Sequence, residues 1–297
     1  MKHLRSFTLA VAVLTVFTVF AATALTPGAA SAANWFTGSI PPGASKTFIW
    51  NNANPLNTSY VVGLDPVGAT IGNSCQVEVT RNWYQQKPSG EREFWFTITN
   101  IGTFSCGANI LLRQLPVANS AWSTGGVNPG QSKTTHWNNA LKERAYAVGF
   151  SPQGATSNAS CQFELVRTWS VMLANGTGLP ERELWFTYKN VGLIACSANI
   201  QVGYQDGADP IQLPSMEIGD SGSWHWNNAN PLDRAYVLDT STGFTTQGNS
   251  CAMEATRGWY VQKVNTTGTT EREFHYTIKN VGTLKCPPSV LLGPADA

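Results

Sequence analysis

Apolar and polar residues alternate over short stretches of this chain, which is the pattern of β-strands with one buried face. From residue 75 to 83, the odd-numbered positions hold Cys, Val, Val, Arg81 and Trp83, and the even-numbered positions hold Gln, Glu, Thr and Asn. The next stretch alternates in the same way, with residues 92, 94, 96 and 98 on one face and Glu93, Trp95, Thr97 and Thr99 on the other. No window of 12 residues has the apolar spacing of a helix. We therefore predict an all-β fold.

Turn-forming residues separate the predicted strands. The stretch "QKPSGE" at 86–91 predicts a hairpin loop, and "PPG" at 41–43 predicts the turn that opens the strand "SKTFIW". In "TNIG" at 99–102, and in the two "KNVG" segments later in the chain, we expect Asn and Gly to supply positive φ. A further strand follows, with Cys, Ala, Ile and Leu at 106, 108, 110 and 112 on its inner face.

One sequence unit occurs three times in the chain. The segments "FIWNNANPLNTSY", "THWNNALKERAY" and "WHWNNANPLDRAY" begin at residues 48, 135 and 224, and their shared Trp residues are Trp50, Trp137 and Trp226. The segments "EREFWFTITNIGTFSC", "ERELWFTYKNVGLIAC" and "EREFHYTIKNVGTLKC" repeat with the same order and spacing. We call the three units copy 1 (33–115), copy 2 (116–208) and copy 3 (209–297). The segments between them are short, so we expect a semi-rigid string of units.

The first 32 residues have the composition of a secretory signal peptide. Lys2 and Arg5 precede an apolar run from Phe7 to Leu25, and small residues at Ala30 and Ala32 form a cleavage motif. An uncleaved membrane anchor is the alternative reading. The sequence therefore predicts a signal peptide over 1–32 and a protein that is secreted, extracellular or associated with the cell envelope.

Six cysteines follow this segment, two in each copy, at equivalent positions. An exported chain meets oxidising conditions, in which disulfides persist. Zinc binding is the alternative, but it favours closely spaced Cys and His ligands, and the spacing here lacks them. We predict one disulfide within each copy, namely Cys75–Cys106, Cys161–Cys196 and Cys251–Cys286.

Short strands, frequent turns and one disulfide for each unit of about 88 residues predict three tandem antiparallel β-sandwiches. The order "NIGTFSC", "VNPGQSKTTHW" and "YAVGFSPQG" resembles the Ig-like adhesion-related (CARDB-type) modules of bacterial secreted proteins. This resemblance implies an Ig-like fold for each unit. It implies no catalytic or binding residue.

The charge balance argues against nucleic acid and anionic membranes as partners. Without the first 32 residues the chain has 17 basic and 18 acidic residues, a net charge of −1, and no basic cluster. We expect no cofactor and no membrane insertion after cleavage of the signal peptide. The oligomeric state stays open.

Catalytic chemistry has weak candidates in this sequence. Outside the signal segment there are three histidines, and the position of His136 and His225 is Ile49 in copy 1. No Ser-His-Asp order, HExxH or GxSxG motif occurs. The pair Glu91/Glu93, which recurs in each copy, has the spacing of glycosidase carboxylates, but its expected place on an open strand favours a solvated strand start, with Arg92 pointing inward. We therefore predict that the protein is not an enzyme.

Arginine and tryptophan are predicted to pair across the hairpin of each copy. Counting back from the loop places Trp83 opposite Arg92, Trp169 opposite Arg182 and Trp259 opposite Arg272. By the same count, the second arginine of each copy faces inward, with its stem buried and its guanidinium on a carboxylate or carbonyl. These second arginines are Arg81, Arg167 and Arg257.

Two features are candidate ligand-binding surfaces. An exposed Trp between Glu and Thr can stack on a sugar ring, or it can be covered by a neighbouring segment. Asparagine pairs can bind sugar hydroxyls, or they can turn the chain while the preceding Trp fills the core. The candidate ligand-binding residues are Trp95, Trp185, Asn51, Asn52, Asn138, Asn139, Asn227 and Asn228.

These features predict a secreted, non-enzymatic repeat protein that binds an extracellular or cell-surface ligand, either a glycan or a protein. The alternative is a structural component of an envelope or matrix. A secreted enzyme inhibitor or hydrolase is a third reading.

Overall fold

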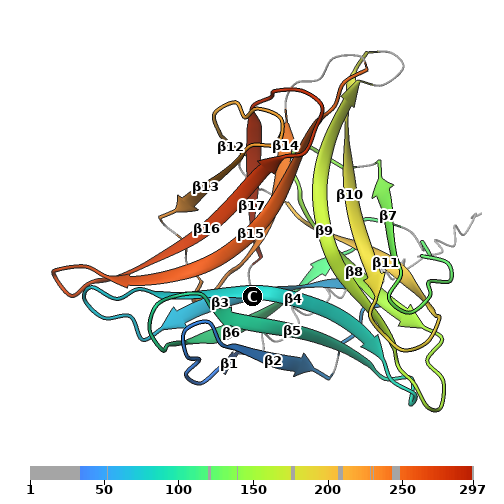
Figure 1. Ribbon diagram of the computed structural model, residues 1–297, viewed down its shortest axis with the longest axis horizontal. Coiled ribbons are helices and arrows are strands. Elements are labelled where there is room, and N and C mark those ends of the chain that lie inside the picture. The colour runs from blue at the N-terminus through green and yellow to red at the C-terminus, as the bar shows by residue number, and fades with distance from the viewer. Residues whose placement is uncertain are drawn as a thin grey trace, which may run out of the picture.

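The computed structural model describes residues 34–295 except 52, 120–121, 139, 175–177, 207–209, 228, 230 and 243–247. The predicted signal peptide lies outside the described residues. All helix or strand structure in the described part is β, which confirms the predicted all-β class (Figure 1). No helix in that part is long and apolar enough to cross a membrane.

The strands of copy 1 form two groups. β2 (Ser45–Trp50) pairs with β5 (Arg92–Asn100), and β5 pairs with β4 (Cys75–Gln86). Separately, β6 (Gly107–Pro116) lies between β1 (Asn34–Phe36) and β3 (Thr58–Val67). All these pairs are antiparallel. The strand β5 buries Phe94, Phe96 and Ile98, as its alternation predicts.

The same pairing order returns in copies 2 and 3, with one difference. Copy 2 has the order β7 (Ser132–Trp137), β10 (Pro180–Asn190) and β9 (Cys161–Ala174), while β8 (Ala145–Gln153) pairs with β11 (Ser197–Gln205) alone. Copy 3 has the order β13 (Ser221–Trp226), β16 (Thr270–Asn280) and β15 (Cys251–Val264), with β17 (Pro288–Ala295) between β12 (Pro210–Gln212) and β14 (Ala235–Thr242).

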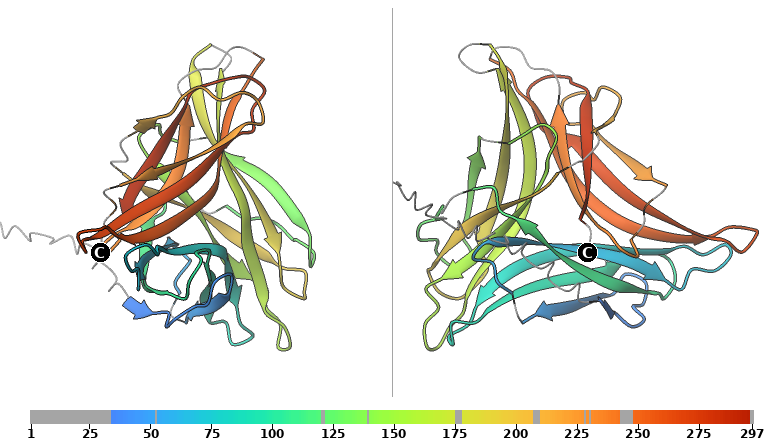
Figure 2. Two further views of the ribbon diagram at one scale, coloured as in Figure 1. Left: turned by 60° about the vertical axis from the view of Figure 1, so that its left-hand side comes forward. Right: turned by 180° about the vertical axis from the view of Figure 1, so that it is seen from behind.

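The three longest strands pair with one another and close a ring. The end of β4 pairs with the start of β9, the end of β9 with the start of β15, and the end of β15 with the start of β4. The three groups of strands therefore lie around a triangle, and they keep this arrangement when seen from behind (Figures 1 and 2). The expected string of units is thus wrong, because backbone hydrogen bonds join each copy to both of the others.

A β-bulge near the middle of each long strand changes which side chains share a face. Thr80 stands outside the register, between the pairs Val79–Ile98 and Arg81–Thr97. An extra residue shifts the alternation by one, so residues beyond the bulge change sides. Arg81 and Trp83 therefore lie with Trp95 on the face of the β2–β5–β4 sheet that points away from the core, which we call the outer face. The prediction that they share a face with Cys75 is wrong. Val166 and Thr256 are the bulged residues of the other copies.

The hairpin register also differs from the prediction. Lys87 N donates to Glu91 O at 2.8 Å, so the loop is short and Gln86 pairs with Arg92. The register therefore differs by three residues from the sequence count. Trp83 consequently lies opposite Trp95, Trp169 opposite Trp185, and Trp259 opposite His275. The predicted pairs Trp83/Arg92, Trp169/Arg182 and Trp259/Arg272 are wrong.

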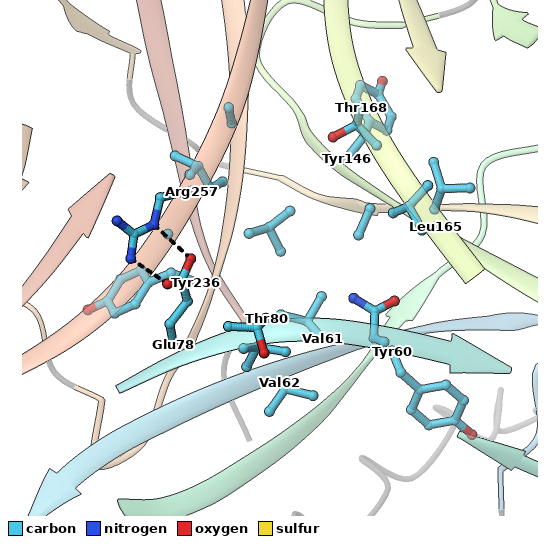
Figure 3. A pocket seen from close by; sticks show the side chains of 18 of the residues that line it. Tyr60, Val61, Val62, Glu78, Thr80, Tyr146, Leu165, Thr168, Tyr236 and Arg257 are labelled. Atoms are coloured by element: carbon cyan, nitrogen blue, oxygen red, sulfur yellow. Dashed lines mark hydrogen bonds and ion pairs between the residues drawn. The ribbon is translucent and has the colours of Figure 1, made fainter. Parts of the chain in front are cut away.

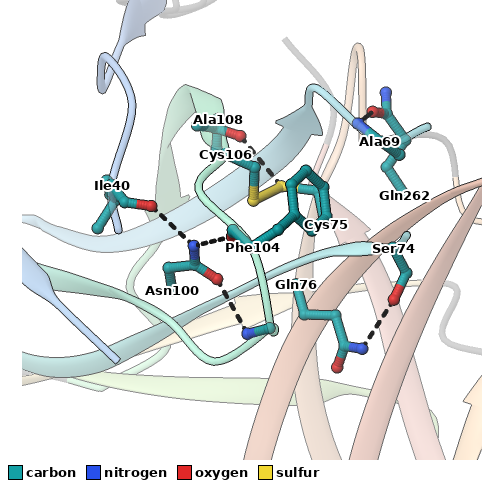
Figure 4. The surroundings of a disulfide bond; sticks show 12 residues. Ile40, Ala69, Ser74, Cys75, Gln76, Asn100, Phe104, Cys106, Ala108 and Gln262 are labelled. Atoms are coloured by element: carbon teal, nitrogen blue, oxygen red, sulfur yellow. Dashed lines mark hydrogen bonds between the residues drawn. A yellow bond between two sulfur atoms is a disulfide. The ribbon is translucent and has the colours of Figure 1, made fainter. Parts of the chain in front are cut away.

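The three predicted disulfides are present. Cys75–Cys106, Cys161–Cys196 and Cys251–Cys286 each join the start of a long strand to the segment before the last strand of that copy. Beside the first disulfide, the buried Asn100 donates from Nδ2 to the carbonyl oxygens of Ile40 and Phe104, both at 2.7 Å (Figure 4). Asn190 and Asn280 make the same contacts in copies 2 and 3.

The glycine two residues after this asparagine is required because a side chain there would be too close to its neighbours, and not because of its φ angle. Gly102 N donates to Asn100 Oδ1 at 2.9 Å, and a Cβ on Gly102 would lie 3.2 Å from that oxygen. In copy 3, a Cβ on Gly282 would lie 2.5 Å from Ser250 O. None of these glycines, and none of the described non-glycine residues, has a positive φ. The expectation that Asn and Gly supply positive φ in these turns is therefore wrong.

Candidate functional site

The Trp-Asn-Asn segments lie at the ends of β2, β7 and β13. Trp50 and Trp137 are partly buried and pack against the core, whereas the side chain of Trp226 is 40% exposed. Trp50 contacts Trp35 edge-on, with ring centroids 5.6 Å apart. The first asparagines, Asn51, Asn138 and Asn227, are exposed, and the second, Asn52, Asn139 and Asn228, lie outside the described residues.

Trp95 and Trp185 stand within rows of stacked rings on the outer face. His136 covers one face of Trp185 at a centroid distance of 4.5 Å, and Trp169 lies on the other side at 5.9 Å. Trp95 stacks on Trp83 at 5.4 Å and pairs with Ile49 on its other side. Both indole N–H groups donate to a glutamate two residues earlier, at 3.0 and 2.7 Å. The rings therefore present their edges to solvent, whereas stacking on a sugar needs a ring face.

Copy 3 replaces the central Trp of this row with His275. It lies between His225 and Trp259, with ring centroids 5.1 Å away on each side. Its Nε2 is 2.6 Å from Glu273 Oε2. Burial of the imidazole lowers the pKa of His275, although Glu273 opposes this shift. Burial would raise the pKa of Glu273, but hydrogen bonds from Lys263 and His275 outweigh it and lower that pKa.

Each row of rings ends in an arginine that clamps the next copy. Arg81 lies over Trp83 at 4.6 Å and makes two hydrogen bonds to Glu164 of copy 2, at 2.9 and 2.8 Å. The same clamp joins Arg167 to Glu254 and Arg257 to Glu78. The predicted carboxylate partner of these arginines is confirmed. Their predicted inward direction is wrong, because the bulge turns them outward to a face where their side chains are 41–47% exposed.

The repeated glutamate pairs do not form a matched pair of carboxylates. Glu91 is exposed beside the hairpin loop, whereas Glu93 is buried and ion-paired with Lys87 at 2.5 Å. Glu183 and Glu273 are likewise buried beneath the outer face, so the expected solvated strand start holds only for the first glutamate of the pair. In the described part of the chain, no group of three or more His, Cys, Asp or Glu could hold a metal ion.

A cavity of about 380 Å³ lies where the three copies meet (Figure 3). We call it the central cavity. Equivalent residues of the three copies line it, because the strands around the ring bring the same positions together. Apolar walls come from the strands β3, β8 and β14, and polar groups come from the long strands. The equivalent sets are Tyr60/Tyr146/Tyr236, Val61/Ala147/Val237, Val62/Val148/Leu238, Val79/Leu165/Ala255 and Asn82/Thr168/Gly258.

The polar groups of the central cavity differ in how they are engaged. Thr80 and Thr256 are exposed, and their hydroxyls already contact β5 and β16. Glu78 and Arg257 satisfy each other through the clamp (Figure 3). Asn82 and Thr168 are partly buried, and their side chains make no hydrogen bond within the described part of the chain. An amide and a hydroxyl are therefore available between apolar walls.

The cavity departs from threefold equivalence at copy 3. There, Ala255 replaces Val79 and Leu165, and Gly258 replaces Asn82 and Thr168. Tyr260 also lines the cavity in copy 3, where its counterparts Tyr84 and Ser170 do not, and Phe274 lines it as Phe94 of copy 1 does. Sequence reasoning missed this cavity because it depends on pairing between copies. The positions 80, 82 and 255 carry no motif, and only the identical spacing of the long strands points to a shared centre.

Comparisons with known proteins add no family assignment. The chain matches no protein-family model, and a search of curated proteins finds no match. The interpretation of the site therefore depends on its geometry alone.

Proposed function

We propose that this protein is a secreted, non-enzymatic binding protein whose ligand is an extracellular or cell-surface glycan. The observation that carries the proposal is the pair of unengaged polar side chains, Asn82 and Thr168, set between apolar walls of the central cavity. Sugars offer hydroxyls that both donate and accept hydrogen bonds, along with apolar ring faces, and such a lining suits them. The predicted signal segment and the three disulfides support secretion.

The chemistry of the lining favours a neutral ligand. Glu78 and Arg257 are paired to each other, and the hydroxyls of Tyr60 and Tyr146 accept hydrogen bonds from backbone N–H groups at 2.7 and 2.8 Å. Burying an uncompensated charge beside these groups would cost free energy with no partner to offset it. A ligand with many hydroxyls and no charge avoids that cost.

We further propose that the chain is three Ig-like β-sandwich units that arose by duplication, with boundaries near 33–115, 116–208 and 209–297. The recurring strand order and the disulfide within each copy support this division. In this view the ring of long strands is a later joining of the units, and the binding site lies at their common centre.

A structural role in an envelope or matrix is the second candidate. The three Arg-Glu clamps and the rows of stacked rings favour it, because the residues that recur on the outer face bind one another. A scaffold needs such contacts and needs no ligand.

Two measurements separate the candidates. The mature protein is applied to a glycan array and to insoluble polysaccharides, and we expect retention on at least one neutral glycan. The Ala255→Leu variant introduces the residue that copy 2 has at the same position, and it should fill the cavity and abolish retention. Leu165→Ala changes the equivalent lining position of copy 2 and enlarges the cavity. This variant is the matched control, and it should fold and keep binding. Absence of retention on every glycan would refute the glycan proposal, and it would favour the structural role.

A further inference from the structure

The arginines at positions 92, 182 and 272 lie near the starts of the equivalent strands β5, β10 and β16, yet each meets a different environment. All three lie near the end of a hairpin that reaches the following copy around the ring. Arg272 Nε donates to Asp65 Oδ1 of copy 1 at 2.6 Å. Asp65 is 1% exposed and also accepts from Asn109 Nδ2 at 3.2 Å. This guanidinium therefore meets a buried carboxylate supplied by the neighbouring copy.

Arg182 also meets a carboxylate from its neighbour. Its Nη2 lies 2.6 Å from Asp239 Oδ2, and its Nη1 donates to Leu141 O and Arg144 O. The arginine is 2% exposed and Asp239 is 6% exposed. In both cases a buried carboxylate is matched by an arginine of the neighbouring copy, as the cost of burying charge requires.

Arg92 occupies the same place at the contact of copies 1 and 2. Gln86 pairs with Arg92 across the hairpin, as Gln262 pairs with Arg272. The Gln86 side chain accepts from Ala155 N at 3.1 Å, and the Gln262 side chain accepts from Ala69 N at 3.0 Å (Figure 4). The two hairpins thus dock on their neighbours through the same contact, which places Arg92 against β8 as Arg272 lies against β3.

The carboxylate is missing at this position. The segments "LDPVGAT" at 64–70 and "FSPQGAT" at 150–156 correspond, so Ser151 stands where copy 1 has Asp65. Ser151 is 0% exposed, and its Oγ has no hydrogen-bond partner. Arg92 Nε is buried without a partner, and no ion pair of Arg92 occurs among the described residues. Two unsatisfied polar groups therefore lie where the other contact has a salt bridge, and Arg92 keeps partial exposure to solvent.

We propose that Arg92 and Ser151 form a binding site for a small carboxylate, which takes the place of the Asp65 side chain of the equivalent contact. The guanidinium donates to the carboxylate oxygens, as arginine does in charge-assisted pairs, and the Ser151 hydroxyl donates to the same group. Serine has a shorter side chain than the aspartate of the equivalent contact, and the partial exposure of Arg92 gives the anion a route from solvent. This site is separate from the central cavity and does not depend on the proposed glycan binding.

The test is the dependence of thermal stability on formate at constant ionic strength, with chloride as the balancing ion. A ligand that binds only the folded protein raises Tm as its concentration increases. We expect formate to raise the Tm of the wild-type protein and to have no effect on Arg92→Met. Ser151→Asp supplies the carboxylate internally, so this variant should have a higher Tm in the absence of formate and should lose the formate response.

Asp65→Ser is the matched control, since it recreates the Arg92 environment at Arg272. This variant should have a lower Tm and a larger response to formate than the wild-type protein. A wild-type Tm that is independent of formate would overturn the proposal and assign the position to water. A formate response that persists in both Ser151→Asp and Arg92→Met would overturn it as well, because the anion would then act elsewhere.

Discussion

The copies meet through two sets of arginines, one on the outer face and one in the interior. The outer set is the same at all three contacts, with Arg81, Arg167 and Arg257 each stacked on a Trp and paired with a Glu of the next copy. The inner set differs at every contact, with an aspartate in two different positions and a serine in the third.

The difference reflects what each environment demands. An exposed ion pair contributes little to stability, and its strength depends weakly on the residues around it. The same pair can therefore recur at all three contacts. An inner contact buries at least one polar or charged group, which must be matched by groups that fit its own surroundings. The contact between copies 2 and 3 differs at two positions from the contact between copies 1 and 2. Ser170 stands where copy 1 has Tyr84, and Asp239 stands where copy 2 has Gly149. Tyr60 N donates to the Tyr84 hydroxyl at 3.1 Å, whereas Tyr146 N donates to Asp239 Oδ2 at 3.0 Å.

Removal of the buried carboxylate should have the largest effect. Asp239→Ala leaves Arg182 buried without a counter-ion and leaves Tyr146 N without an acceptor, so we expect a loss of about 3–5 kcal/mol in the free energy of unfolding. Urea denaturation measures it. Glu217→Ala, which removes an exposed carboxylate paired with Lys285, is the control and should change stability little. A loss below about 1 kcal/mol for Asp239→Ala would mean that water satisfies Arg182.

Converting one inner contact into another should recover part of that loss. Asp239→Gly combined with Ser170→Tyr introduces the residues that copies 1 and 2 use, and the new hydroxyl should accept from Tyr146 N. We expect the double variant to be about 1 kcal/mol more stable than Asp239→Gly alone, the usual contribution of one hydrogen bond. Equal stability of the two variants would show that the two solutions are not interchangeable.

An outer clamp should be worth much less. Arg167→Met removes the guanidinium that lies over Trp169 and pairs with Glu254, so we expect a loss of roughly 0.5–1 kcal/mol. The same change at Arg81 should have a similar effect, because the contacts are equivalent. The loss should shrink in high salt. Strongly unequal losses at the two positions would break the equivalence of the clamps.

The smallest effect concerns the outer row of copy 3, in which burial lowers the pKa of His275. Because the folded-state pKa of His275 is lowered, the unfolded state binds more protons, and stability falls as the pH drops below about 6.5. Glu273, whose pKa is also lowered, adds a further loss as the pH falls through its folded-state pKa. Since His275 keeps some solvent contact, we expect only a few tenths of a kcal/mol from it.

His275→Trp tests this effect, because it introduces the residue of the other two copies. The variant should lose the change in stability between pH 7 and pH 5.5 that belongs to His275, as measured by urea denaturation at several pH values. His225 provides the comparison, since it contacts the same row and its substitution by Ile, the residue of copy 1, leaves His275 in place. A pH dependence that is unchanged in His275→Trp would assign it to other groups.

The fold was largely predictable from local pattern. The alternation of Phe94, Phe96 and Ile98, the Pro-Gly turns and the paired cysteines each depend on neighbouring residues, and each prediction was confirmed. The bulge was not predictable, because Thr80, Val166 and Thr256 share no residue type that marks an irregular strand. One extra residue then reversed the predicted direction of every arginine clamp.

The candidate sites were harder to predict because they depend on contacts between copies. The Trp-Asn-Asn words stand out in the sequence, but their tryptophans serve partly as packing groups. Asn82, Thr168 and Ser151 carry no motif, and their significance comes from which strand of another copy lies opposite. Pairing between segments of different copies, such as Trp83 with Glu164 and Glu78 with Trp259, leaves no signal in the local alternation of either segment.

The ring of long strands has a consequence for how such a protein can change its length. Each of β4, β9 and β15 uses its two halves to bind two different neighbours, so the pairing closes at three copies. An open array of repeats tolerates gain or loss of a unit at its end, whereas deletion of one copy here would leave two half-strands with unpaired N–H and C=O groups. A two-copy chain would therefore be driven to borrow the missing strand from another molecule.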